Sequence, residues 1–233
     1  MAGTDLTDTR RQLHRVAAHI LARRRFHEVG RFGLRASPGG FTTGPFGPGP
    51  DTLRIAGDRL VHEDGPNAVT IPITGHSLRD LAAATRTDLG ADFSAGAGMP
   101  DPGDLDAPIR LDADACDAMA DWFDTGWRVL DAVVAAMGPG AAPATIQLWP
   151  EHFDAGTNVA VGGDRANLGF SAGDSFSADP YAYIGLWTAA SPGDPQFWNA
   201  PFGAVLTRSA AGPDPGGSAR SFLERGLSLL ARP

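Results

Sequence analysis

The chain has 233 residues, 42% of them hydrophobic and 20% charged, with a formal net charge of −8 at pH 7. These values are typical of a soluble globular protein that buries a substantial core, and the acidic balance disfavours nucleic-acid binding, which requires a basic surface. The single cysteine, Cys116, excludes an intramolecular disulfide and a cysteine-based zinc site. No uncharged apolar run approaches the length of a membrane span, and the N-terminus lacks the apolar core of a signal peptide. We therefore expect a soluble cytoplasmic protein.

The first element predicted is a helix over residues 7–27. Leu13, Val16, Ile20 and Leu21 recur at helical spacing and form an apolar stripe. The arginines at 23–25 lie near the C-terminal end, where positive charge complements the helix dipole. We interpret them as a solvated face; an anion-binding patch is the alternative.

Residues 31–74 are predicted to form short strands joined by turns. The expected strands cover 32–36, 52–55, 59–62 and 68–73. The second and third flank Ala56-Gly57-Asp58, a sequence typical of a hairpin turn. The segment 44–50 contains three prolines and is expected to be a loop, since proline cannot donate to a strand ladder.

Two helices and a linker are predicted in the middle of the chain. Ser77 and Asp80 have the spacing of a capping box, and Gly90 is expected to end the helix that they begin. Residues 91–110 are rich in Gly and Pro and are predicted to be a linker. Asp112 then caps a long helix over 113–137. Beyond the central stretch, a strand over 202–208 and a helix over 218–231 complete the chain.

This order of elements predicts an α+β fold with mainly antiparallel sheet and flanking helices, because short strands joined by tight turns favour antiparallel pairing. We expect one compact domain over 1–233, or two packed halves, about 1–90 and 111–233, joined by the 91–110 linker. Segments 34–39 and 168–173 share a Leu, Ser and Gly spacing, which leaves open a pseudo-repeat of two helix–strands–helix halves.

The residues best suited to chemistry follow a short strand, in Trp149-Pro150-Glu151-His152-Phe153-Asp154. In an extended segment His152 and Asp154 point the same way, and an imidazole beside a carboxylate is either a metal pair or a base with its orienting partner. Both need a third group, for which Glu151 and Asp174 are available. A divalent metal is therefore a possible cofactor, whereas no nucleotide-binding motif is present. The alternative is structural: Asp154 and Asp174 close turns, and His152 satisfies a carbonyl.

The run Tyr181–Trp187 alternates as a strand does. Tyr181, Tyr183 and Trp187 share one face, and Gly185 leaves a gap between them into which a ligand could fit. With Trp149 and Asn167 they are the predicted ligand-binding residues. The alternative is that this aromatic face packs in the core.

These motifs resemble a family of uncharacterised actinobacterial proteins from high-GC genomes. Leu148 to Asp154 matches its Leu-Trp-Pro-Glu-His-Phe-Asp run, and Asn167 to Gly169, Ser171 to Asp174 and Pro180 to Trp187 match its later motifs. Gly33 to Phe41 fits its N-terminal motif, so the resemblance spans most of the chain. Leu186 departs from it, where the family pattern has Pro. The family carries no activity that could be transferred.

From the residues we expect a small-molecule enzyme with metal-assisted hydrolytic or acid–base chemistry. The catalytic candidates are Glu151, His152, Asp154 and Asp174, with His152 and Asp154 as the metal pair. The alternative, from a different class, is a non-catalytic module that binds a small ligand or a partner protein. If the two motifs form one site, His152 and at least one of Asp154, Asp174, Tyr181 or Tyr183 line a common concavity.

Overall fold

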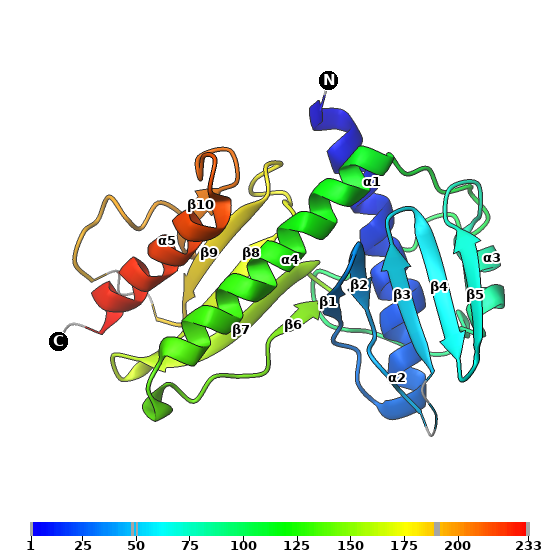
Figure 1. Ribbon diagram of the computed structural model, residues 1–233, viewed down its shortest axis with the longest axis horizontal. Helices are drawn as coiled ribbons and strands as arrows, with labels where there is room; N and C mark the ends of the chain where they lie inside the picture. The colour runs from blue at the N-terminus through cyan, green and yellow to red at the C-terminus, as the bar shows by residue number, and fades with distance from the viewer. Residues whose placement is uncertain (1, 48, 50, 189–191, 232–233) are drawn as a thin grey trace. The chain divides into compact units, whose positions relative to one another are not determined.

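The computed structural model describes residues 2–47, 49, 51–188 and 192–231, and it confirms the predicted α+β class (Figure 1). It contains two five-stranded sheets, with strand orders β1-β2-β3-β4-β5 and β10-β9-β8-β7-β6. The chain forms two compact units. The first contains residues 1–124 and 148–153, and the second contains 125–147 and 154–233. No helix in the described ranges is both long enough and apolar enough to cross a membrane.

The predicted first helix is confirmed, with an irregularity at its centre. It consists of α1 (Ala2–Val16), the π-helical segment η1 (Ala17–Ala22) and α2 (Arg23–Val29), which follow one another directly. Every residue of η1 is buried. A π-helical turn widens the helix because its hydrogen bonds join residues five apart. Gly30, at φ 67°, then ends α2.

The sheet of the first unit is a series of antiparallel hairpins. Its strands are β1 (Arg35–Ser37), β2 (Gly40–Thr42), β3 (Thr52–Ala56), β4 (Arg59–Asp64) and β5 (Asn67–Pro72). The predicted hairpin about Gly57 is confirmed, with Ile55 opposite Leu60. The views from the front and from behind both show α1–α2 crossing one face of this sheet. In the predicted 44–50 loop, positions 48 and 50 lie outside the described residues.

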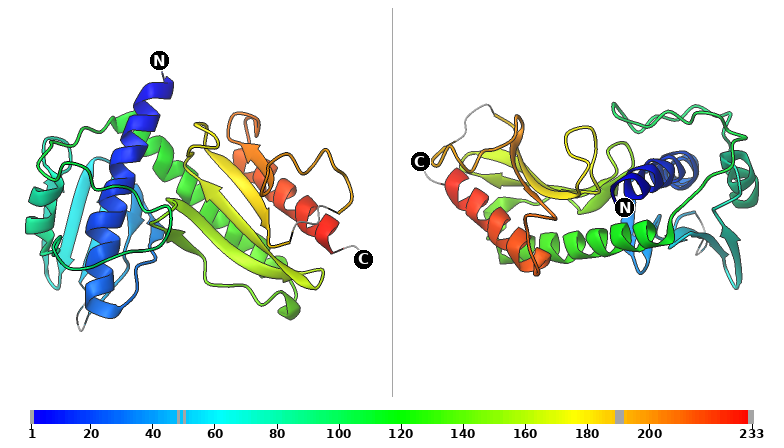
Figure 2. Two further views of the ribbon diagram at one scale, coloured as in Figure 1. Left: turned by 180° about the vertical axis from the view of Figure 1, so that it is seen from behind. Right: turned by 90° about the horizontal axis from the view of Figure 1, so that it is seen from above.

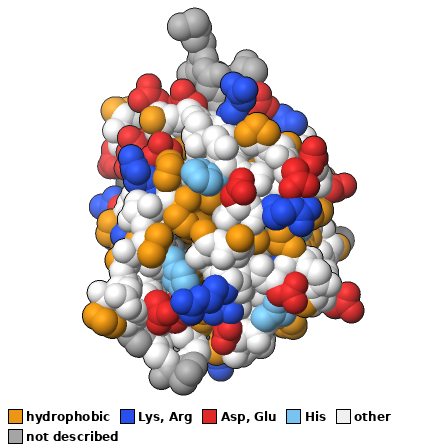
Figure 3. All heavy atoms as spheres, turned by 90° about the vertical axis from the view of Figure 1, so that its right-hand side faces the viewer, with side chains coloured by type: hydrophobic (Ala, Val, Ile, Leu, Met, Phe, Trp, Pro, Cys, Tyr) orange, Lys and Arg blue, Asp and Glu red, His pale blue; other side chains and the backbone are white. Residues whose placement is uncertain are grey.

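Helix α3 (Leu78–Thr85) begins as predicted but ends early. The Ser77–Asp80 capping box is present. The prediction that Gly90 ends the helix is wrong, because Arg86 adopts the left-handed conformation and its N–H bonds back to Ala82 and Ala83 carbonyls. On the side of the first unit that carries β5 and α3, acidic, basic and apolar side chains are intermixed, without a large area of one charge among the described residues (Figure 3).

Residues 91–110 contain no helix or strand and belong to the first unit. Side chains of the first helical segment hold them through backbone carbonyls. Arg15 donates to Pro102 O, the His19 Nε2 atom lies 2.8 Å from Pro100 O, and Arg23 donates to Ala91 O at 2.6 Å. Carbonyl groups of this Gly- and Pro-rich segment, which is in no strand, thus accept hydrogen bonds from helix side chains.

The second unit is a sheet with helices on one face. Its elements are the C-terminal part of α4 (Ala113–Ala136), the short 3₁₀ turn η2 (Pro139–Ala141), β6 (Gln147–Trp149, shared with the first unit), β7 (Asp154–Val161), β8 (Asp164–Ser171), β9 (Tyr181–Leu186), β10 (Gly203–Thr207) and α5 (Pro215–Leu230). The helices at 113–137 and 218–231 and the strand at 202–208 are confirmed within a few residues. Helix α5 begins three residues earlier than predicted because the Asp214 carboxylate accepts the Gly217 N–H.

Both views of Figure 2 place the second half of α4 and α5 on the same side of this sheet. Phe170 and Ile184 point toward them, and Gly126 and Gly226 let the helices approach closely: a Cβ at Gly226 would lie 3.0 Å from Ile184. The opposite face carries the alternate residues of each strand, among them Asp154, Asn167 and Tyr183, and within the described part of this unit no helix covers it. We call it the open face.

Candidate functional site

The turn that follows Trp149 is held by one buried side chain, Phe153. Its N–H donates to the Trp149 carbonyl at 2.7 Å, and its φ is +56°, a conformation that bulky residues rarely adopt. Its ring is 2% exposed, lies 5.2 Å from Phe123 and 5.5 Å from Phe41, and stacks on His14 at 5.2 Å. These contacts within the first unit hold the turn in its strained conformation. Strained backbone conformations that are held in this way are common at functional sites.

The strained turn places Glu151 inside the first unit. Its side chain is 8% exposed, and its Oε2 atom has no hydrogen-bond partner among the described residues. Burial raises the pKa of this carboxyl above its ordinary value, and its own backbone N–H and the nearby His152 offset only part of that shift. Removal from water disfavours the ionised form of a carboxyl, so burial favours the protonated form of Glu151.

Two histidines of the first helical segment lie in the same unit, His14 half-buried and His19 buried. His14 Nε2 is 2.8 Å from Pro150 O, and His19 Nε2 is 2.8 Å from Pro100 O. Because a carbonyl can only accept, each Nε2 carries a proton and donates it. Burial lowers the pKa of His14 to about 4 and also lowers that of His19, so both imidazoles are neutral at pH 7. The His19 Nδ1 atom is buried and has no partner in the described part of the chain.

His152, the central candidate of the sequence prediction, lies on the surface of the same unit. Its side chain is exposed, and its ring lies against Gly98, where an added Cβ would come within 2.9 Å of Nδ1. Trp149 is half-buried near Phe32, with ring centroids 6.5 Å apart. Around this turn the first unit therefore contains the buried carboxyl of Glu151, the neutral imidazoles of His14 and His19, and the exposed imidazole of His152.

The other predicted residues lie on the open face of the second unit, where two tyrosines each donate to an aspartate. Tyr183 donates to Asp154 Oδ2, and Tyr181 donates to Asp174 Oδ2 at 2.6 Å. Burial, together with the aspartates, raises the pKa of both phenols well above the ordinary value. Both phenols are therefore hydrogen-bond donors at neutral pH and not nucleophiles.

A glycine explains how Tyr183 reaches Asp154. Gly169 lies opposite Tyr183 in the ladder, and a Cβ there would overlap the Tyr183 ring. The ring thus lies across β8, and its hydroxyl reaches β7 beside Gly156. A Cβ on Gly156 would lie 3.3 Å from this hydroxyl oxygen. The sequence prediction interpreted only Gly185 as a gap; Gly169 is the glycine that receives a side chain.

The far end of the open face carries Trp187, which is 56% exposed. Its indole N–H donates to Asn167 Oδ1 at 2.9 Å, and the Arg165 guanidinium lies 5.8 Å from its ring centroid. Phe176 and Phe202, also exposed, contact the tyrosines at 5.9 and 6.3 Å between centroids. The predicted alternation of this strand is confirmed, and its aromatic side is partly exposed.

The predicted residues thus belong to different units: Trp149, Glu151 and His152 to the first, and Asp154, Asn167, Asp174, Tyr181, Tyr183 and Trp187 to the second. That His152 shares a concavity with the second group stays a prediction. Within the described residues, no group of three or more His, Cys, Asp or Glu side chains is arranged to hold a metal ion. Sequence reasoning missed His14 and His19, because their five-residue spacing fits no common α-helical face and only the π-helical turn accommodates it.

Comparisons with known proteins gave no match to a family model, to a curated protein or to a solved structure.

Proposed function

We propose that the protein is a small-molecule enzyme with acid–base chemistry, in which Glu151 is the proton donor. One observation carries this proposal: the Glu151 carboxyl is buried, lacks a partner for one oxygen, and has a raised pKa. A carboxyl with a raised pKa keeps its proton to a higher pH than an ordinary glutamate does, and it can therefore protonate a poor leaving group where an ordinary glutamate is already ionised.

The surrounding groups fit the same chemistry. The neutral His19 has a buried Nδ1 lone pair that can accept a proton, while its Nε2–H is held by Pro100 O. His152, next to Glu151 in the chain, is exposed to solvent. We assign His14 a positioning role, because its Nε2–H holds the Pro150 carbonyl and its ring supports Phe153. The proposal rests on proton transfer alone.

A substrate screen with matched variants tests this proposal. Chromogenic esters, phosphate esters and glycosides would be assayed against the wild type, Glu151→Gln and Glu224→Gln, the last being an exposed glutamate on α5. We expect turnover of one class to fall by a factor of about 100 or more in Glu151→Gln and to remain unchanged in Glu224→Gln. Equal turnover in all three proteins would contradict the assignment of Glu151.

A second candidate function is a non-catalytic ligand-binding module on the open face. The exposed Trp187, fixed by its bond to Asn167, favours it, because a preset aromatic ring loses little entropy on binding. Native mass spectrometry of protein purified from its host would detect a retained small molecule. We expect Trp187→Ala to lose that molecule and Trp127→Phe, a change on α4 away from the open face, to keep it; retention by both variants would contradict this candidate.

A further inference from the structure

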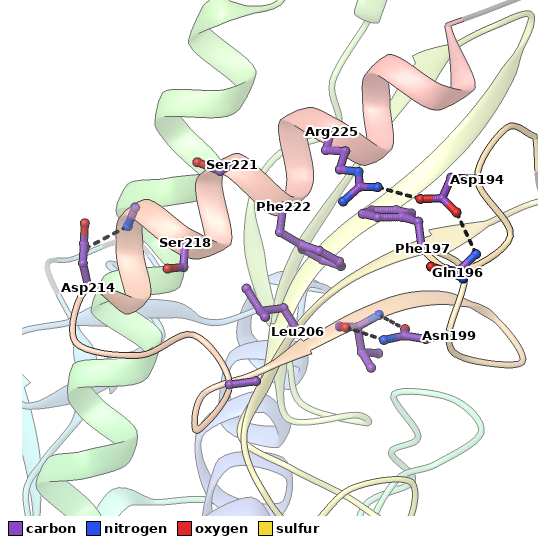
Figure 4. A pocket seen from close by; sticks show the side chains of 13 residues that line it. Asp194, Gln196, Phe197, Asn199, Leu206, Asp214, Ser218, Ser221, Phe222 and Arg225 are labelled. Carbon is purple, nitrogen blue, oxygen red and sulfur yellow. Dashed lines mark hydrogen bonds and ion pairs between the residues drawn. The ribbon is translucent and has the colours of Figure 1, made fainter.

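A groove in the second unit is lined by none of the catalytic or ligand-binding residues that the sequence predicted. It runs between α5 and the edge strand β10, and residues 194–199 close one side of it (Figure 4). Its volume is about 850 Å³. Sites for small molecules commonly have volumes of several hundred to about 1,000 Å³, so the groove has the size of a small-molecule site.

The floor of the groove is aromatic and apolar. Phe197 and Phe222 stack with centroids 5.2 Å apart, and Leu206 extends the surface from β10 (Figure 4). Phe197 is buried, while Phe222 is half-buried and turned to the groove. Trp198, whose ring lies 4.9 Å from Phe197, is fixed by a hydrogen bond from its indole N–H to Pro192 O. The floor is therefore preset, flat and apolar.

The charged groups at one end neutralise each other. Arg225 donates to Asp194 Oδ2 at 2.6 Å, and its guanidinium lies 5.3 Å from the Phe197 centroid. The other Asp194 oxygen accepts the Gln196 N–H at 2.9 Å. The Asp214 carboxylate, which also lines the groove, accepts the Gly217 N–H at 3.0 Å at the start of α5. An anion would meet this carboxylate and an arginine that is already paired, so the lining favours a neutral molecule over an anionic one.

Hydroxyl groups line the wall formed by α5. Ser218 Oγ donates to Ala211 O at 2.7 Å, which leaves its lone pairs available as acceptors. Ser221, one turn further along the same side of the helix, also lines the groove and is exposed. These two serines offer hydrogen bonds to a hydroxyl or amide of a ligand that lies on the aromatic floor.

The edge strand itself is closed to an added peptide strand. The Asn199 side chain accepts the Val205 N–H at 2.8 Å and donates to the Val205 carbonyl at 3.1 Å. Gly203 makes two hydrogen bonds with Ala200. An edge whose outward groups are occupied cannot extend the sheet, so a small molecule, and not an extended peptide, suits the groove.

We propose that this groove is a binding site for a neutral small molecule with a flat apolar ring system and one or more hydroxyl groups. The ring system covers Phe222, and the hydroxyl bonds to the Ser218 and Ser221 side. Glu151 does not line this groove, and the proposal does not depend on its chemistry.

Titration of the full chain with 2-naphthol, followed by amide chemical shifts in NMR, tests this proposal. We expect saturable shifts confined to residues 194–225, with a dissociation constant of about 1 mM or lower, as a fragment of this size permits. Ser221→Tyr fills the groove from an exposed position without removing a buried group, and we expect it to weaken binding at least about tenfold. Ser228→Tyr places the same side chain on α5 beyond the lining and should bind as the wild type does.

A comparator fixes the chemical class of the ligand. 2-Naphthoate has the same rings with a carboxylate, and we expect it to bind more weakly than 2-naphthol because Arg225 is already paired. Three results would each overturn the proposal: no saturable binding of 2-naphthol, shifts centred outside residues 194–225, or equal affinity of the Ser221→Tyr and Ser228→Tyr variants.

Discussion

Glu151 and Asp154 stand three positions apart in the chain, but their carboxyl groups have different surroundings. Glu151 is buried in the first unit, and the hydrogen bond that lowers its pKa comes from its own backbone N–H. Asp154 begins β7 of the second unit and accepts the Tyr183 hydroxyl. Asp174, also in the second unit, accepts the Tyr181 hydroxyl and two backbone N–H groups.

The difference shows that one acidic motif can contain two kinds of carboxyl group. A carboxylate that accepts a hydroxyl group from another strand supports the fold, whereas a buried carboxyl that no side chain of a described residue is seen to donate to has a raised pKa and suits acid catalysis. Removing the first kind therefore costs stability, and removing the second kind costs function but little stability. The predictions below test this contrast.

The largest effect is expected for Asp154→Ala. It removes the acceptor of the Tyr183 hydroxyl and leaves that group buried, so we expect the free energy of unfolding to fall by about 3 kcal/mol. Glu151→Gln is the comparison and should change it by less than about 1 kcal/mol at pH 7, since it deletes no satisfied hydrogen bond of Oε2. Urea denaturation of both variants measures the difference; equal losses would refute the contrast.

A glycine pair on the open face gives the next effect. In Gly169→Ala the new Cβ would occupy the place of the Tyr183 ring, and we expect a loss of about 2 kcal/mol. In Gly185→Ala the nearest atom is 3.6 Å from the new Cβ, so the change should stay within about 0.5 kcal/mol. Thermal unfolding of the two variants checks the prediction. If Gly185→Ala were the more damaging change, the described path of Tyr183 would be wrong.

The strands and helices could be predicted from local patterns, because the hairpin turns, caps and apolar stripes are local. The confirmed helix 113–137 and the hairpin about Gly57 are examples. The surroundings of Glu151 could not be predicted, since they depend on non-local contacts. His14 meets a carbonyl 136 positions away, and the left-handed Phe153 that turns Glu151 inward is fixed by Phe41 and Phe123. The sequence prediction chose His152 as the central site residue from its spacing to Asp154 alone, although the His152 side chain is exposed.

The pH dependence of stability separates the buried acid from the rest of the chain. The pKa of Glu151 is raised in the folded protein, so in this pH range the folded state binds more protons than the unfolded state does. The contribution of Glu151 to stability therefore falls as the pH rises from the unfolded pKa of about 4.3 to the folded pKa. The slope in this window is at most about 1.4 kcal/mol per pH unit. Glu151→Gln removes it, so the stability of the variant relative to the wild type should increase with pH. A difference that is constant from acidic to neutral pH would speak against a raised pKa.

The smallest change in stability at neutral pH is expected from ionisation of the two tyrosines of the chain, because they affect folding only at alkaline pH. Their raised pKa values mean that folding should weaken as pH rises above about 10, because only the unfolded phenols then ionise. Ultraviolet titration of the folded protein should show no phenolate at pH 10, and titration in denaturant should show ordinary ionisation of both. Ordinary ionisation in the folded protein would contradict the hydrogen bonds to Asp154 and Asp174.

Carbon-13 NMR of glutamate side chains tests the central claim most directly. The chain has four glutamates, so selective labelling of their carboxyl carbons gives four signals, and Glu151→Gln identifies one of them. We predict that the Glu151 signal titrates above the ordinary glutamate value of about 4.3. A Glu151 signal that titrates at or below that value would contradict its assignment as the proton donor.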